Sequence, residues 1–120
     1  MIESLKKILF LSEKNLIFCP WCSQKTSKEY LSYLLSEIEE LRKGIENNDS
    51  KNISEELGDI FWTYLVLMSL CEKEFGINKT EVMEMIVRKI EKRKPWLIES
   101  KKVTFEEAER IWNAAKKERI

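Results

Sequence analysis

Four acidic residues occur in two pairs whose spacing suits metal binding. The pairs are Glu37 with Glu40 and Glu56 with Asp59. Side chains three residues apart lie on one face of a helix, so each pair can converge on one ion, and antiparallel helices can bring the two pairs together. Carboxylates at one site repel one another unless cations neutralise them, and an all-oxygen cluster selects hard cations. The pattern therefore predicts a site for Mg²⁺, or Mn²⁺, rather than for zinc or iron.

A simpler interpretation of the same residues is a solvated acidic helix face. Glutamate is a favoured helix former, and the spacing Glu-x-x-Glu is a weak motif in helical proteins. Spacing alone does not decide between a metal site and an acidic surface.

The composition excludes several classes of catalytic site. The chain has no histidine among its 120 residues, which rules out Ser-His-Asp and Cys-His arrangements, the HExxH zinc site and the Glu-x-x-His di-iron site. Gly44, Gly58 and Gly76 are the only glycines, and they lie too far apart for a Walker A loop or a GxGxxG turn. Any phosphate chemistry must therefore rest on side chains and a metal ion.

The charges balance over the whole chain but separate along it. There are 21 basic and 21 acidic residues. Residues 29–59 contain nine acidic and three basic side chains, a balance of −6, whereas residues 88–102 contain seven basic and two acidic ones, a balance of +5. The first region can hold metal and the second can hold anionic phosphates. Zero net charge and the acidic cluster argue against non-specific nucleic-acid binding.

No apolar stretch is long enough to cross a membrane. The longest runs from Ile60 to Cys71, well below the roughly 20 residues that a bilayer requires. The N-terminal apolar run ILFL is too short for the core of a signal peptide. We therefore expect a cytoplasmic protein without a membrane partner, and its three cysteines do not suggest a disulfide framework.

Helix signals recur along the chain and predict an all-α fold. Scarce glycine and proline and apolar residues spaced by three and four favour helices, and Ser, Thr, Asn or Asp can start each of them. The expected helices cover about residues 2–12, 26–47, 51–75, 78–94 and 104–119, the third ending at Gly76 and the fourth at Pro95.

The second and third helices should be antiparallel neighbours, because only a short turn separates them. We expect their core stripes to consist of Leu31, Leu34, Leu35, Ile38, Leu41 and Ile45 on one and Ile53, Leu57, Phe61, Tyr64 and Met68 on the other. The segment 60–71 is apolar nearly all round, which suggests burial against another subunit. The prediction is a single domain, 1–120, forming an antiparallel bundle of about four main helices plus a C-terminal helix, as the protomer of a dimer.

The segment Cys19-Pro20-Trp21-Cys22 permits three interpretations. A redox motif would need a βαβ setting, whereas the surroundings here are helical. A zinc site would need two more ligands, and only Cys71 remains, so it would have to be shared between subunits. The simplest interpretation is that Cys19 and Trp21 pack the loop against the helices.

Several motifs together resemble the MazG family of nucleoside triphosphate pyrophosphohydrolases. They occur in family order and are Cys19-Pro20-Trp21 with Thr26, Tyr33-Leu34-Leu35-x-Glu37-x-x-Glu40, Glu55-Glu56-Leu57-Gly58-Asp59, Lys89-x-x-x-Arg93-x-Pro95 and Trp112-x-x-x-Lys116. The resemblance implies an all-α protomer that forms dimers, with tetramers possible, and that hydrolyses nucleoside triphosphates to the monophosphate and pyrophosphate with Mg²⁺.

The resemblance also implies roles for individual residues. Glu37, Glu40, Glu56 and Asp59 would be the metal ligands, and either Glu37 or Glu40 would orient or deprotonate the attacking water. Lys89 and Arg93 match phosphate-binding positions. Trp112 and Lys116 would lie near the nucleotide, where the indole could stack on the base, although tryptophan on an amphipathic helix is more often a packing residue.

Two other functions stay open at this point. The first is a related pyrophosphatase acting on another nucleotide, such as phosphoribosyl-ATP or a deoxyuridine nucleotide. The second is a catalytically silent helical dimer that binds nucleotides or a partner protein. The intact set of four carboxylates favours an enzyme.

Overall fold

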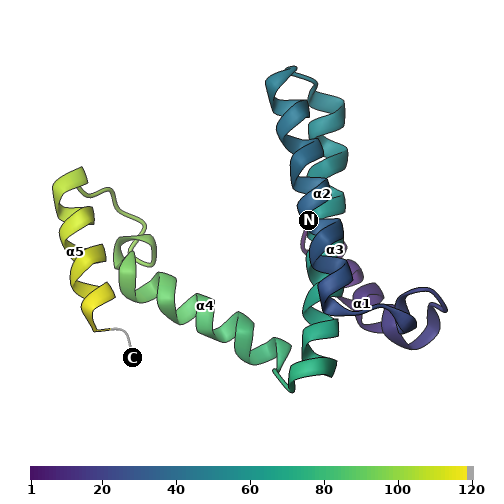
Figure 1. The fold of residues 1–120 in the computed structure, drawn as a ribbon. Coiled ribbons are helices and arrows are strands. Elements are labelled where there is room, and N and C mark those ends of the chain that lie inside the picture. Colours follow the sequence, from purple (N-terminus) through teal and green to yellow (C-terminus); the bar gives the residue numbers. More distant parts are fainter. Residues whose placement is uncertain (119–120) are drawn as a thin grey trace. The chain divides into compact units, whose positions relative to one another are not determined.

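The computed structural model describes residues 1–118, and these residues form helices joined by turns, with no strand among them (Figure 1). The helices are α1 (Ile2–Phe18), α2 (Ser27–Glu46), α3 (Ser50–Phe75), α4 (Lys79–Arg93) and α5 (Phe105–Lys117), with short 3-10 turns η1 (Cys22–Gln24) and η2 (Pro95–Leu97). The predicted all-α fold is confirmed. No helix within the described part of the chain has the length and apolar character to span a membrane.

The chain forms two compact units, which we describe separately. The first unit covers residues 1–77 and contains α1 to α3, and the second begins at Asn78 and contains α4 and α5. In the first unit α3 packs against both α2 and α1, and in the second α5 packs against α4. That the whole chain works as one domain stays a prediction.

Side-chain caps define the helix starts that the sequence predicts. Thr26 and Glu29 form a reciprocal capping box at α2. The side chains of Asn78 and Thr104 accept backbone hydrogen bonds at the starts of α4 and α5. Gly76 ends α3 with φ of 68°, the left-handed conformation expected there. The predicted end of the last helix, at about residue 119, lies outside the described residues.

The first helix is longer than the predicted segment 2–12, because the polar residues at 12–15 do not interrupt it. It continues to Phe18. Ser12 lies fully buried and its hydroxyl donates to the Leu9 carbonyl at 2.7 Å, so this polar side chain is satisfied inside the helix. Leu9, Ser12 and Leu16 follow helical spacing on the inward face.

The α2–α3 hairpin is packed differently from the predicted core stripes. Leu31, Leu35, Ile38 and Ile45 on α2, and Leu57, Phe61 and Tyr64 on α3, are exposed. The prediction for these seven residues is wrong, because apolar side chains cover more of each helix than the neighbouring helix can bury. Of the predicted stripe on α2, Leu34 and Leu41 do lie on the inward side, together with Glu37 and Gly44. Of the stripe on α3, Ile53 is half-buried and Met68 is buried.

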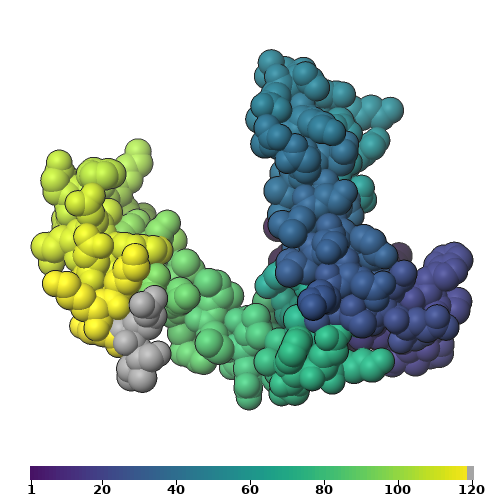
Figure 2. Space-filling view, in the orientation of Figure 1, coloured from purple at the N-terminus to yellow at the C-terminus, as the bar shows by residue number. Residues whose placement is uncertain are grey.

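A small residue allows α2 and α3 to approach closely near their connecting turn. Gly44 is buried, and a Cβ atom there would lie 3.0 Å from Nδ2 of Asn52 and 3.3 Å from Cγ1 of Ile53. This end of the hairpin extends beyond α1, as the ribbon and the space-filling view both show (Figures 1 and 2).

The core of the first unit lies in the other half of the hairpin. Val66 and Leu70 of α3 are fully buried with Cys22 and contact Leu16, Cys19, Tyr30 and Trp62. Much of the apolar segment 60–71 is therefore covered within the same chain, and its burial does not by itself require another subunit.

Candidate metal centre

Three of the four predicted ligands come together between α2 and α3. Glu37 extends from α2, while Glu56 and Asp59 extend from successive turns of α3. One carboxylate oxygen from each lies within 4.8 Å of those from the other two. Two of the three side chains are half-buried. The geometry suits a small cation that three carboxylates contact at once.

The electrostatics of Glu56 favour the same interpretation. Its Oε2 atom is buried and has no hydrogen-bond partner among the described residues. Burial raises the pKa of Glu56, and the neighbouring carboxylates of Asp59, Glu37 and Glu40 raise it further. A buried carboxylate oxygen without a donor is costly, whereas a cation would satisfy it and neutralise the repulsion. The residues therefore fit a bound divalent cation.

Glu40 is the predicted ligand that lies outside this group. Its side chain is exposed and forms an ion pair with Lys43 on the same helix, with 3.6 Å between Nζ of Lys43 and Oε1 of Glu40. It is nevertheless close enough to raise the pKa of Glu56. Its role as a fourth ligand stays a prediction.

A buried hydroxyl contacts the group from the next turn of α3. Oγ1 of Thr63 donates to Oε1 of Glu37 at 2.9 Å, and Thr63 is 5% exposed. Thr63 was not among the predicted site residues. The available signal was its position, seven residues after Glu56 on the same helix face, in an otherwise apolar stretch.

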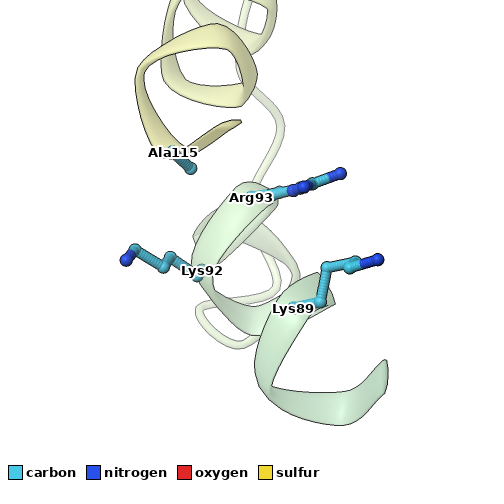
Figure 3. A pocket seen from close by; sticks show the side chains of 4 residues that line it. All are labelled: Lys89, Lys92, Arg93 and Ala115. Atoms are coloured by element: carbon cyan, nitrogen blue, oxygen red, sulfur yellow. The ribbon is translucent and has the colours of Figure 1, made fainter. Parts of the chain in front are cut away.

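The predicted phosphate-binding residues lie in the second unit. Lys89 and Arg93 line a pocket of about 120 Å³ together with Lys92 and Ala115. Figure 3 shows the side chains of Lys89 and Arg93 extending to the same side of α4, with Lys92 on the other side. Lys92 forms an ion pair with Glu118 at 2.9 Å. The pocket thus presents two cations from one helix face.

Arg93 and Trp112 form a cation–π pair. The Arg93 guanidinium carbon lies 5.0 Å from the centroid of the Trp112 ring, and the ammonium of Lys94 lies 5.6 Å from it. Arg93 is 8% exposed, so most of this charged side chain is covered by the rest of the protein. Lys116 is exposed on α5. The carboxylate group and this basic pocket belong to different units, and a joint role in substrate binding stays a prediction.

The cysteine segment has a structural role that differs in part from the simplest interpretation. Cys22 is 1% exposed and packs in the core, and Cys19 contacts the same cluster. Trp21, expected to pack there too, is 79% exposed, because the turn at residues 19–22 directs Cys22 inward instead. Burial raises the pKa of the Cys22 thiol. The cysteines belong to no metal-binding cluster within one chain, because among residues 1–118 only Glu37, Glu56 and Asp59 form a group with metal-binding geometry.

Comparisons with known proteins agree with the all-α fold. Residues 25–98 match the family model described as the MazG nucleotide pyrophosphohydrolase domain. The crystal structure of a mazG-related protein from Thermotoga maritima superposes with a TM-score of 0.88 at 36% identity, over 93% of this chain and 98% of that one.

Curated relatives are longer proteins. The chain is 30% identical over 88 residues to the uncharacterized protein YabN of Bacillus subtilis (strain 168), which is 73% of this chain and 18% of YabN. It is 27% identical over 116 residues to a nucleoside triphosphate pyrophosphohydrolase of Mycobacterium tuberculosis, which is 95% of this chain and 36% of that protein. The chain thus spans about a fifth to a third of the length of these relatives.

Proposed function

The chain belongs to the MazG nucleotide pyrophosphohydrolase family, and we propose that it hydrolyses nucleoside triphosphates to the monophosphate and pyrophosphate with Mg²⁺. The observation that supports this most directly is the convergence of Glu37, Glu56 and Asp59 on one point, with oxygens within 4.8 Å of one another. Carboxylates that serve only solubility are expected to point into solvent, because they repel one another when they converge between two helices.

Glu37, Glu56 and Asp59 would hold the cation, with Glu40 as a fourth ligand. An all-oxygen set without histidine or thiolate suits Mg²⁺, and Mn²⁺ can replace it. When bound, the ion would supply positive charge that neutralises the phosphate oxygens of the substrate. Glu40 lies exposed beside Lys43 at 3.6 Å, so a change of rotamer is enough to free its carboxylate from that surface pair.

A carboxylate would also orient the attacking water. Glu37 or Glu40 is the proposed base, which accepts a proton from the water as it attacks the phosphorus atom. In-line attack, opposite the leaving pyrophosphate, requires the water and the triphosphate to be held in a fixed orientation relative to each other.

The basic pocket of the second unit would bind the anionic end of the substrate. Lys89 and Arg93 extend to one side of α4 (Figure 3). The guanidinium can form forked hydrogen bonds to phosphate, and the ammonium adds a second positive charge. Trp112 and Lys116 would contact the nucleoside, the indole by stacking on the base.

A second copy of the chain would cover the exposed apolar residues of the hairpin. Leu31, Leu35 and Ile38 on α2 are 46–59% exposed, and Leu57, Phe61 and Tyr64 on α3 are 39–53% exposed. Contiguous apolar residues of this kind mark interaction surfaces, and homodimers are the commonest assembly. Light scattering should give the mass of a homodimer, or of a tetramer built from dimers, and Phe61→Glu should shift it to the monomer. The control Phe10→Glu, on α1, should leave the mass unchanged.

The test of the activity is an assay of pyrophosphate release with and without Mg²⁺. It uses NTPs, dNTPs including dUTP, and phosphoribosyl-ATP, and it identifies the products as monophosphate and pyrophosphate. Turnover only in the presence of Mg²⁺ is expected. A correctly folded oligomer that turns over none of these nucleotides would contradict the proposal and leave a nucleotide-binding or partner-binding dimer in its place.

A further inference from the structure

We propose that Thr63 is a positioning residue that orients the Glu37 carboxylate for metal binding. The inference rests on the proposed metal centre and adds a residue that no motif of the sequence identifies. Its basis is the hydrogen bond from Oγ1 of Thr63 to Oε1 of Glu37, 2.9 Å long and joining α3 to α2 across 26 residues of sequence.

The direction of this hydrogen bond follows from the chemistry of its partners. An ionised carboxylate only accepts hydrogen bonds, so the hydroxyl must be the donor. Threonine in a helix commonly donates to the carbonyl of its own preceding turn. Here the hydroxyl reaches the neighbouring helix instead. The bond therefore restricts the rotation of a glutamate side chain that would otherwise have several rotamers.

The burial of Thr63 makes the contact rigid. Thr63 is 5% exposed and lies beside Leu65 and Val66, which are fully buried in the core of the first unit. Its β-branched side chain has restricted χ1 rotamers within a helix. The core thus holds the hydroxyl in place, and the hydroxyl holds one oxygen of Glu37.

Glu37 and Glu40, the two predicted ligands on α2, differ in how firmly their side chains are held. Glu37 is half-buried and anchored by Thr63. Glu40 is exposed, and its ion pair is with the flexible ammonium of Lys43 on the same helix. Thr63 therefore explains why Glu37, and not Glu40, joins Glu56 and Asp59 in the group with metal-binding geometry. Groups that orient metal ligands in this way typically change metal affinity by about 10- to 100-fold when removed.

Three variants separate positioning from general stability. Thr63→Val removes the hydroxyl and keeps the shape, and Thr63→Ser keeps the hydroxyl. The matched control is Ser69→Ala, which removes another buried hydroxyl of α3, one that donates to the Leu65 carbonyl at 3.2 Å. The probe is Mn²⁺ alone, with the dissociation constant measured by electron paramagnetic resonance of the free ion. Thermal unfolding of the metal-free variants provides the second readout.

We expect Thr63→Val to raise the Mn²⁺ dissociation constant by about 10- to 100-fold, with Thr63→Ser within about threefold of the unsubstituted protein. Ser69→Ala should lower the unfolding midpoint and leave the dissociation constant unchanged. Equal Mn²⁺ affinity for Thr63→Val and the unsubstituted protein overturns the inference, as does an equal loss in Ser69→Ala.

The same measurement distinguishes this inference from the proposed activity. If the unsubstituted protein binds Mn²⁺ and the variants behave as expected, the role of Thr63 stands even where no nucleotide is hydrolysed. If the unsubstituted protein does not bind Mn²⁺, both the metal centre and the role of Thr63 are overturned.

Discussion

Glu37 of α2 and Glu56 of α3 face each other across the hairpin, with ligand oxygens within 4.8 Å. They occupy part of the helix interface that leucine side chains would ordinarily fill, while Leu35 and Leu57 of the same helices are 59% and 53% exposed. Such an arrangement lowers the stability of the isolated metal-free chain. It is consistent with a hairpin whose acidic side is used for ion binding and whose apolar stripes are available for association.

Glu56→Gln should abolish tight Mg²⁺ binding and lower the rate of nucleotide hydrolysis by on the order of 10²-fold or more, because it removes a ligand charge. It should also raise the unfolding midpoint of the metal-free protein, since the repulsion that raises the pKa of Glu56 disappears. Calorimetry measures both binding and unfolding. The control is Glu55→Gln, which changes the neighbouring exposed carboxylate. Equal effects of the two substitutions would contradict the assignment.

As the pH is lowered, metal binding should begin to weaken at a higher pH than it would if the pKa of Glu56 were that of an ordinary glutamate. The pKa of Glu56 is raised above 4.5, so protons compete with the cation from that raised value downward. Between pH 4.5 and the raised pKa the unfolded chain binds fewer protons than the folded one. The free energy of unfolding of the metal-free protein should therefore fall as the pH rises through this window.

Titrations of Mn²⁺ binding between pH 4 and about pH 8 measure the loss of affinity, and thermal unfolding scans over the same range measure the change in stability, with metal-free Glu56→Gln as the control for the unfolding scans. An affinity that stays constant down to pH 4.5, or a metal-free protein that becomes more stable as the pH rises through the window, would contradict the raised pKa.

Arg93→Lys should raise the KM for nucleoside triphosphates by about tenfold, because lysine retains the charge but not the forked donors. Mn²⁺ affinity should stay unchanged, since the substitution leaves the carboxylates intact. Steady-state kinetics measure the effect. Lys101→Gln is the matched control, because Lys101 is exposed, does not line this pocket and pairs with Glu99. A larger KM effect from Lys101→Gln than from Arg93→Lys would exclude the proposed phosphate site.

Cys22 should resist thiol reagents in the folded protein. It is 1% exposed, and burial raises the pKa of its thiol, so little thiolate is present at neutral pH. Cys19 and Cys71, which are half-buried, should react before Cys22 with a disulfide reagent, and all three cysteines should react in denaturant. Mass spectrometry of the labelled peptides identifies each site. Rapid labelling of Cys22 without denaturant would show that the core of the first unit opens readily.

Local signals in the sequence were sufficient for the helices and most of their ends. Thr26, Asn78 and Thr104 form the expected caps, and Gly76 ends α3 in the left-handed conformation. These features depend on residues within one turn of each other, so spacing is enough to predict them. Helix α1 is longer than the spacing predicts, because burial and a hydrogen bond to the Leu9 carbonyl satisfy the polar Ser12 inside the helix.

The candidate site depended on packing. The spacing of Glu37, Glu56 and Asp59 is visible in the sequence, but only the contact between α2 and α3 decides that these carboxylates converge, that Glu40 remains outside and that Thr63 donates to Glu37. Helical periodicity says which residues share a face. It does not say which face meets a neighbour when apolar residues surround much of the helix, and that choice rests on the close approach at Gly44 and on the core formed with Cys22.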